Sequence, residues 1–211
     1  MYDEFSAMPS IYGLKPRFQH LLRPITNGLA RLGVTANQVT LAALFLSFAT
    51  GAVILYWPAP RRLLLLPIAL FVRMALNAID GMLAREHNQK TSLGAVLNEL
   101  GDVLSDSALY LPLAFLPGFH PPLMVLIVLL AMLSEMTGVI GAQIGASRRY
   151  DGPMGKSDRA FVFGTLGLLL GLNLPIVPVV PYLLGLVLAL LLCTVINRAR
   201  GALKELRGST S

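Results

Sequence analysis

Long stretches without a charged residue dominate this chain, and they lie at 32–60, 107–134, 136–147 and 160–197. A helix needs roughly 20 apolar residues to cross a hydrocarbon core about 30 Å thick, and these runs reach that length alone or with their neighbours. Only 13% of the residues are charged, whereas a soluble domain carries about 25%. We therefore predict an all-α integral membrane protein.

The apolar runs divide into six predicted spans. The longest run, 160–197, would form a helix of about 57 Å, which is too long for one crossing. Three prolines, Pro175, Pro178 and Pro181, interrupt it and favour a turn between two spans. The predicted spans are 35–57, 63–85, 93–116, 121–146, 159–174 and 177–197. Residues 35–197 would then form a six-helix catalytic domain, between a cytoplasmic interfacial segment at 1–34 and a basic cytoplasmic tail at 198–211.

The basic residues fall mainly on one side of these spans. Of 17 lysines and arginines, all but Arg61, Arg62 and Arg73 flank the spans on the side that holds both termini. The positive-inside rule therefore places both termini in the cytoplasm. This placement accounts for the net charge of +6 without a nucleic-acid partner.

The first 34 residues predict an amphipathic helix. Apolar residues recur at helical spacing from Ile11 to Leu32, with basic residues elsewhere around the wheel. This pattern is typical of a helix that lies in the membrane interface, and we predict a break near Pro24. An ordinary basic flank is the alternative interpretation.

Two glycine stripes predict close helix packing. They consist of Gly138, Gly141 and Gly145 in the fourth span and of Gly164, Gly167 and Gly171 in the fifth. Small residues at this spacing let helices approach one another inside a membrane.

The second and third spans contain an unusual number of polar side chains. The short loop HNQKTS at 87–92 joins them into a helical hairpin. Positions 73, 77, 80 and 84 share one helical face, and positions 98, 102 and 106 share another. An unpaired charge at mid-bilayer costs about 2.5–3.5 kcal/mol, so these faces should turn toward one another or toward a wet cavity. Counting helical rise from the loop matches Asp80 with Asn98, Asn77 with Asp102, and Arg73 with Asp106.

These matched depths separate a structural acid from two candidate ligands. Asp106 has Arg73 at its depth, which predicts a buried ion pair. Asp80 and Asp102 have no basic residue at their depth in these two spans. Carboxylates without a counter-charge are typical of a cation site, and oxygen ligands suit Mg²⁺ or Mn²⁺. Gly81 and Ala84 leave room beside them, so we predict a site for metal and phosphate.

The same residues carry a family resemblance. Asp80-Gly81-x-x-Ala84-Arg85, followed by Gly94, position 98 and Asp102, resembles the signature D-x-x-D-G-x-x-A-R-x8-G-x3-D-x3-D of the CDP-alcohol phosphotransferases. Residues 34–40, VTANQVT, resemble the (T)PN-x-x-T entry segment of that family, and residues 155–159, GKSDR, resemble its basic loop. The resemblance covers nearly the whole chain and looks closest to a poorly characterised inner-membrane branch in enteric and related bacteria.

The resemblance implies a function for each part of the signature. Members of the family transfer a substituted phosphate from a CDP-linked donor, usually CDP-diacylglycerol, to an alcohol, and they release CMP in phospholipid biosynthesis. Positions 77, 80 and 98 would hold Mg²⁺ or Mn²⁺, and Asp102 would be both a metal ligand and the base. The implied nucleotide-binding residues are Gly81, Ala84, Arg85, Gly94, Lys156 and Arg159. A multi-pass inner-membrane homodimer among membrane lipids is implied as well.

The chain departs from the signature at two positions. Asn77 and Asn98 stand where the family has aspartate, and each keeps a carbonyl oxygen but removes one negative charge. Glu99 is a candidate replacement ligand, and Glu135 in the fourth span is another. One metal in place of two, compensation by these acids, and loss of catalysis all stay open. The alternative functions are therefore a homologue that binds nucleotide or lipid without turnover and, with less support, a cation or proton transporter.

Overall fold

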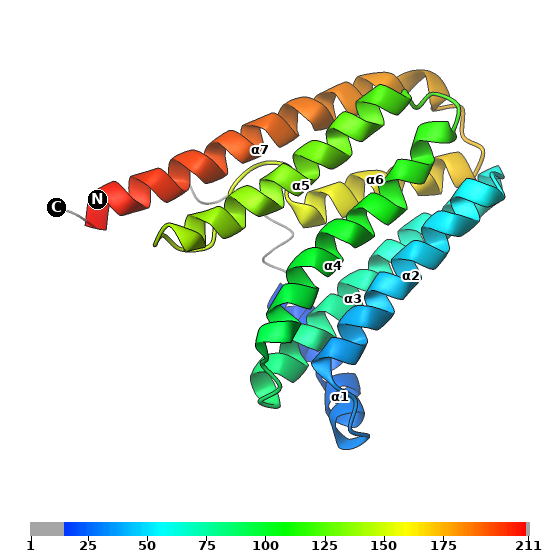
Figure 1. Ribbon diagram of the computed structural model, residues 1–211. Coiled ribbons are helices and arrows are strands. Elements are labelled where there is room, and N and C mark those ends of the chain that lie inside the picture. Colours follow the sequence, from blue (N-terminus) through cyan, green and yellow to red (C-terminus); the bar gives the residue numbers. More distant parts are fainter. Residues whose placement is uncertain (1–14, 210–211) are drawn as a thin grey trace. The chain divides into compact units, whose positions relative to one another are not determined.

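The computed structural model describes residues 15–209, and these residues form helices and connecting turns with no strand (Figure 1). The apolar runs become helices because, in lipid, each helix satisfies its own backbone hydrogen bonds. The α-helices are α1 (Lys15–Arg31), α2 (Ala36–Tyr56), α3 (Leu65–Glu86), α4 (Ser92–Tyr110), α5 (Pro121–Gln143), α6 (Lys156–Gly171) and α7 (Val180–Ser209). Short 3₁₀ turns are η3 (Pro60–Leu64), η4 (Leu111–Phe115) and η5 (Val177–Val179).

Four of the described helical segments are long and apolar enough to cross a membrane. They are Ala36–Tyr56, Pro60–Glu86, Pro121–Gln143 and Val177–Gly208, which correspond to the first, second, fourth and sixth predicted spans. The other two predicted spans form the helices α4 and α6. Helix α4 carries several acids, and α6 has only 16 residues. The prediction of an all-helical membrane protein is confirmed, whereas a crossing by α4 and α6 stays a prediction.

Helix α1 continues through Pro24, so the predicted break at this proline is wrong. Proline lacks an N–H donor, so it weakens the helix locally. Burial of residues before and after Pro24 compensates for this loss of helix stability. Leu22 and Thr26 are buried, and the Thr26 hydroxyl donates to Leu22 O at 3.1 Å. Leu21 and Ile25 are exposed, and contact of this face with a membrane stays a prediction. Residues 1–14 of the predicted interfacial segment lie outside the described residues.

The chain divides into two compact units. Among the described residues, unit 1 comprises 15–43 and Val72–Gly101, and unit 2 comprises Leu44–Phe71 and 102–209. Helices α2, α3 and α4 each contribute residues to both units.

Unit 1 has a small apolar core that fixes the start of α2. Its buried residues are Leu22, Ala36, Val39, Ile79, Met82 and Leu83. Thr35 and Gln38 cap α2 reciprocally, because each side chain accepts a hydrogen bond from the backbone N–H of the other. In addition, Ala36 N donates to Gln89 Oε1 at 2.7 Å. The loop between α3 and α4 is therefore tied to the N-terminus of α2.

Unit 2 holds the larger core, and its glycines permit close packing. Helices α5 and α7 run side by side (Figure 1). A Cβ atom on Gly167 of α6 would lie 3.1 Å from Leu63 O in η3. On α5, a Cβ atom on Gly138 would lie 2.7 Å from Arg149 O in the loop before α6. These contacts agree with the predicted packing role of both glycine stripes.

Helix α7 extends past the predicted end of the sixth span. It continues to Ser209, so most of the predicted tail at 198–211 is a continuation of the helix. Glu205 on this extension binds the loop before α6, through Arg149 Nη1 at 2.9 Å and Ser147 N at 2.8 Å. Arg149 also pairs with Asp151 at 2.7 Å. The hydrogen bond to Asp151 and the charge of Glu205 raise the pKa of Arg149 above its ordinary value.

Candidate functional site

Asp80 on α3 is the buried acid of unit 1. Its side chain is nearly inaccessible, and Thr40 Oγ1 donates to Asp80 Oδ2 at 2.8 Å. The same hydroxyl lies 3.1 Å from Ala36 O within α2. Thr40 closes the 34–40 entry segment, so two separate parts of the sequence pattern meet at one carboxylate. A carboxylate held by a hydroxyl in this way has a fixed orientation, as a ligand position requires.

Gly94 allows a second contact of the entry segment. A Cβ atom at this position would lie 2.7 Å from Asn37 Oδ1 and 3.0 Å from Thr91 Oγ1. Glycine at the start of α4 thus lets the Asn37 amide approach the helix closely. This contact explains the glycine structurally, and the nucleotide-binding role of Gly94 stays a prediction.

Gly81 directly follows Asp80 on α3, and the Arg85 side chain lies against it. A Cβ atom on Gly81 would lie 3.1 Å from Arg85 Nη1, so the guanidinium folds back over the glycine. Arg85 is exposed, and Ala84 between them is half-buried. The structure therefore places an exposed guanidinium over Gly81 on α3, an arrangement that suits an anionic ligand.

Unit 1 also contains the other candidate metal ligands. Asn77 lies on α3, while Asn98 and Glu99 lie on α4, and all three are half-buried. Amide and carboxylate oxygens are the donors that Mg²⁺ and Mn²⁺ prefer. Within residues 15–209, no three His, Cys, Asp or Glu side chains gather into a metal-binding group. The donor set fits an oxygen-preferring divalent ion, with two asparagine oxygens among the candidate ligands.

Asp102, the predicted base, belongs to unit 2 and has a basic partner. Lys156, the first residue of α6, forms an ion pair with Asp102 Oδ1. The side chains of Lys156 and Asp102 are 31% and 23% exposed. The expectation that Asp102 lacks a counter-charge is therefore wrong. That argument considered only the second and third spans, whereas the lysine comes from the start of the fifth.

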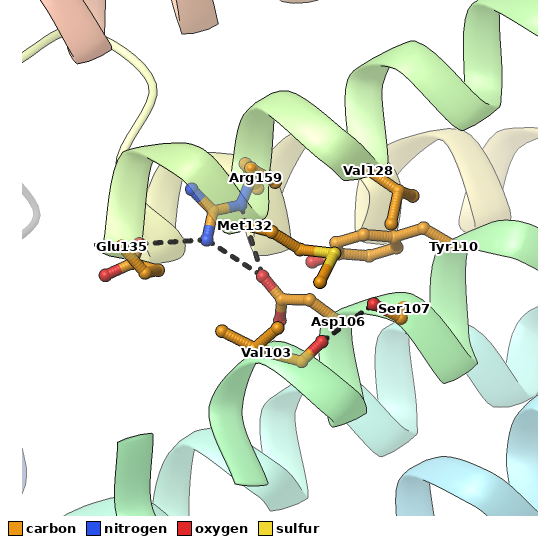
Figure 2. A pocket seen from close by; sticks show the side chains of 9 residues that line it. Val103, Asp106, Ser107, Tyr110, Val128, Met132, Glu135 and Arg159 are labelled. Carbon is orange, nitrogen blue, oxygen red and sulfur yellow. Dashed lines mark hydrogen bonds and ion pairs between the residues drawn. The ribbon is translucent and has the colours of Figure 1, made fainter. Parts of the chain in front are cut away.

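One turn further along both helices lies a buried ion pair. Arg159 of α6 donates to Asp106 Oδ2 from Nη2 at 2.9 Å, and the two side chains are 1% and 7% exposed (Figure 2). Its Nη1 donates to Met154 O at 3.2 Å. The sequence predicted an ion pair of Asp106 with Arg73, which stays a prediction, and a nucleotide-binding role for Arg159. Because its donors are used within the chain, the structure favours a structural role for Arg159.

Glu135 on α5 joins this cluster. Its Oε1 accepts from Arg159 Nη2 at 3.1 Å, and its Oε2 lies 3.3 Å from Arg198 Nη1 on α7. Arg198 also donates to Ser134 O at 2.5 Å. Two arginines and two acids thus balance one another in the buried part of unit 2. Both Glu135 oxygens face arginines, which disfavours Glu135 as a replacement metal ligand.

Three successive pairs join α4 to α6. After Asp102–Lys156 and Asp106–Arg159, the Tyr110 ring stacks on Phe163 with centroids 4.3 Å apart. Both helices advance in the same direction through these pairs, from a partly exposed polar end to an apolar end. A small cavity flanks the middle pair and is lined by Val103, Asp106, Ser107, Tyr110, Val128, Ala131, Met132, Glu135 and Arg159 (Figure 2).

Comparison with known proteins agrees with these observations. The family model for CDP-alcohol phosphatidyltransferase matches residues 33–197. Inner membrane protein YnbA of Escherichia coli (strain K12) is 50% identical over 194 residues, which cover 92% of this chain and 96% of that protein. Phosphatidylinositol phosphate synthase of Mycobacterium tuberculosis (strain ATCC 25618 / H37Rv) is 30% identical over 133 residues, which cover 62% of this chain and 60% of the synthase.

Two crystal structures of the Mycobacterium tuberculosis phosphatidylinositol phosphate synthase share the fold. The structure with CDP-DAG bound superimposes with a TM-score of 0.69 at 22% identity, covering 85% of this chain and 92% of that chain. The structure in complex with manganese and citrate gives a TM-score of 0.68 at 24% identity, covering 85% of this chain and 87% of that chain.

Proposed function

This chain belongs to the CDP-alcohol phosphatidyltransferase family, and we propose that it transfers a substituted phosphate from CDP-diacylglycerol to a small alcohol, releasing CMP. The observation that carries the proposal is the Thr40–Asp80 hydrogen bond of 2.8 Å. It joins the entry segment to the signature, so these two motifs form one local structure rather than two coincidental matches. The related phosphatidylinositol phosphate synthase, which has been crystallised with CDP-DAG bound, supports a CDP-lipid donor.

We assign the metal role to oxygen donors of unit 1. Asp80 supplies the charged oxygen, and Asn77, Asn98 and Glu99 supply the further oxygens. A divalent ion bound to them would neutralise pyrophosphate charge and stabilise the departing CMP. The manganese in the related synthase structure supports Mn²⁺ or Mg²⁺ as that ion. Gly81 and Ala84 leave space for the nucleotide, and Arg85 offers it a positive charge.

We assign the base role to Asp102. Its carboxylate would take the proton of the acceptor hydroxyl while the alcohol oxygen forms a bond to phosphorus. The bond between that phosphorus and the oxygen of CMP breaks in the same step, so the leaving group departs as CMP. Lys156 contacts the carboxylate and would orient it. The chain's apolar helices would keep the acylated part of the donor in lipid.

The proposed setting is the bacterial inner membrane. YnbA is an inner membrane protein, and the distribution of basic residues favours cytoplasmic termini. We propose six crossings, with α4 and α6 completing the four strongly apolar segments, and a homodimer as in the family. The partners would then be the lipid donor, a small alcohol and the surrounding lipids.

Measurement of CMP release tests the proposal. Purified full-length protein in lipid nanodiscs is incubated with Mg²⁺, radiolabelled CDP-diacylglycerol and single alcohols from a panel of polyols, amino alcohols, inositol and sugar phosphates. We expect one class of alcohol to yield a labelled lipid together with CMP, and we expect chelator to stop the reaction. Release that persists with chelator, or in Asp102→Asn, would contradict the mechanism.

A second candidate function is binding without turnover. Two observations favour it: asparagine at positions 77 and 98, and the lysine that engages the proposed base. If CDP-diacylglycerol binds but no alcohol releases CMP, this function replaces the first. Restoring both acids by Asn77→Asp with Asn98→Asp then distinguishes the two cases, because only an impaired homologue would gain activity that it lacked before.

A further inference from the structure

Two neighbouring arginines, Arg61 and Arg62, lie in η3 at one end of unit 2 and are exposed. The far end of α6 packs against η3, because a Cβ atom on Gly171 would lie 3.1 Å from Leu64 N. Helix α6 begins at Lys156 and has 16 residues, so about 24 Å separate its two ends. The arginines therefore lie at the end of unit 2 that is remote from Lys156.

The acids of unit 2 gather at the opposite end from these arginines. Its described residues include six acids, and each belongs to or contacts the first turn of α6 or the loop before it. They are Asp102, Asp106, Glu135, Asp151, Asp158 and Glu205. Within the described part of unit 2, the charges of Arg61 and Arg62 therefore have no acid to balance them.

Two aromatic side chains adjoin the arginines. Tyr56 ends α2 and Trp57 follows it, and their rings meet edge to face with centroids 6.4 Å apart. Both side chains are exposed, Trp57 to 58%. Arg62 Nη1 donates to Trp57 O at 2.7 Å, which places the guanidinium beside the tryptophan. Tryptophan and tyrosine are enriched at the headgroup level of membranes, so this group has the composition of an interfacial site.

The position of the group along the chain also places it at the headgroup level. Of the segments long and apolar enough to cross a membrane, Ala36–Tyr56 ends just before it, and Pro60–Glu86 begins with η3. In the proposed orientation, this end of unit 2 meets the outer leaflet. Phospholipid phosphates lie at that level, and a guanidinium can bind a phosphate with two parallel N–H groups.

We propose that Arg61 and Arg62, with Trp57 beside them, bind the headgroup of an anionic phospholipid such as phosphatidylglycerol. The inference does not depend on the proposed transferase activity, whose residues lie elsewhere. An anionic headgroup supplies the negative charge that unit 2 lacks at this end. Phosphatidylcholine is the poorer ligand, because its own cationic group offsets the phosphate. The bound lipid also accounts for two arginines on the side of the membrane where basic residues are usually scarce.

Fluorescence of Trp57 tests the proposal locally, because it is the only tryptophan in the chain. Full-length protein is placed in phosphatidylcholine nanodiscs that contain either phosphatidylglycerol or phosphatidylcholine brominated close to the headgroup. Bromine quenches a tryptophan that it contacts, so the two quenching curves give the relative affinity of the lipids beside Trp57. We expect a preference of about tenfold for phosphatidylglycerol at low ionic strength, which decreases as salt is added. Equal quenching by the two lipids would overturn the proposal.

The variants test whether the two arginines cause that preference. Arg61→Gln with Arg62→Gln should abolish it, whereas Arg61→Lys with Arg62→Lys keeps both charges and should preserve it. The matched control is Arg200→Gln with Lys204→Gln, which removes two exposed charges from α7 and should leave the preference unchanged.

Three outcomes with these variants would contradict the proposal. A preference that survives in the glutamine variant would show that the arginines do not bind the headgroup. A preference lost equally in the lysine variant would overturn the electrostatic basis of the proposal. An equal loss in the control at α7 would show that quenching follows the overall charge of the protein rather than a site at η3.

Discussion

The two ion pairs between α4 and α6 involve similar residues in contrasting surroundings. Lys156 and Asp102 are partly exposed, whereas Arg159 and Asp106 are buried and share their charges with Glu135 and Arg198. A partly exposed pair can separate and re-form at little cost, because water solvates both groups. A buried pair separates only at a high cost, because no water solvates the charges that are released. We therefore expect changes in the first pair to affect the proposed reaction and changes in the second pair to affect the stability of the fold.

The largest expected effect is the loss of catalysis in Asp102→Asn. The amide cannot take a proton from the acceptor, so we expect CMP release to fall by about 10²–10⁴-fold. Thermal unfolding in detergent should change little, because the pair is partly exposed. Unchanged CMP release would contradict the base role of Asp102. The proposed functional difference between the Asp102–Lys156 pair and the Asp106–Arg159 pair would then lose its support.

The buried pair should show the opposite behaviour. Arg159→Met removes the arginine that binds Asp106 and leaves Arg198 as the partner of Glu135, and we expect a loss of about 3–5 kcal/mol in the free energy of unfolding. Denaturant unfolding of the detergent-solubilised protein measures it. Adding Asp106→Leu to Arg159→Met should recover part of this stability, since it removes one buried charge. A single variant as stable as the wild type would show that the cluster does not hold unit 2 together.

A smaller effect is expected in unit 1, at the hydroxyl that holds Asp80. Thr40→Val removes the hydrogen bond to the carboxylate but keeps the shape of the side chain. We expect Mn²⁺ affinity to fall by about 10–100-fold, as measured by titration of the full-length protein. Thr137→Val is the matched control, because the Thr137 hydroxyl donates to Leu133 O at 2.7 Å within its own helix. Equal affinities for the two variants would argue against a metal at Asp80.

The smallest effect is expected at an exposed ion pair of unit 1, between α1 and the end of α3. Arg23 Nη2 lies 2.9 Å from Glu86 Oε1, and both side chains are well exposed. Because water screens such a pair, Arg23→Ala should leave the unfolding midpoint of the protein unchanged. A clear decrease would show that exposed and buried pairs differ less than their surroundings suggest.

The sequence predicted the helices well because the length and composition of the apolar runs match what a membrane-spanning helix requires. It also predicted which glycines allow close packing, since small residues at helical spacing have few other uses in such helices. It did not predict that Lys156 binds Asp102, that Arg159 binds Asp106, or that Arg159 and Arg198 bind Glu135. Lys156, Arg159 and Arg198 come from helices that follow later in the chain, and depth within one hairpin carries no information about them.

The Pro24 prediction failed for a related reason. Proline weakens a helix locally, but the burial of Leu22 and Thr26 depends on distant residues that local propensity ignores. The signature acids, in contrast, were found by spacing alone. Their surroundings, including the Thr40 hydroxyl on Asp80, required the structure.

The extension of α7 bears on how the protein should be shortened or tagged. The 30 residues of this helix span about 45 Å, which exceeds the hydrocarbon thickness of about 30 Å. Glu205, near the C-terminus of this helix, binds Arg149 and Ser147 in the loop that leads into α6. Deleting a seemingly dispensable basic terminus would release that loop and, with it, the start of the helix that carries Lys156. Fusions placed after Ser209 should be tolerated far better than truncation at 197.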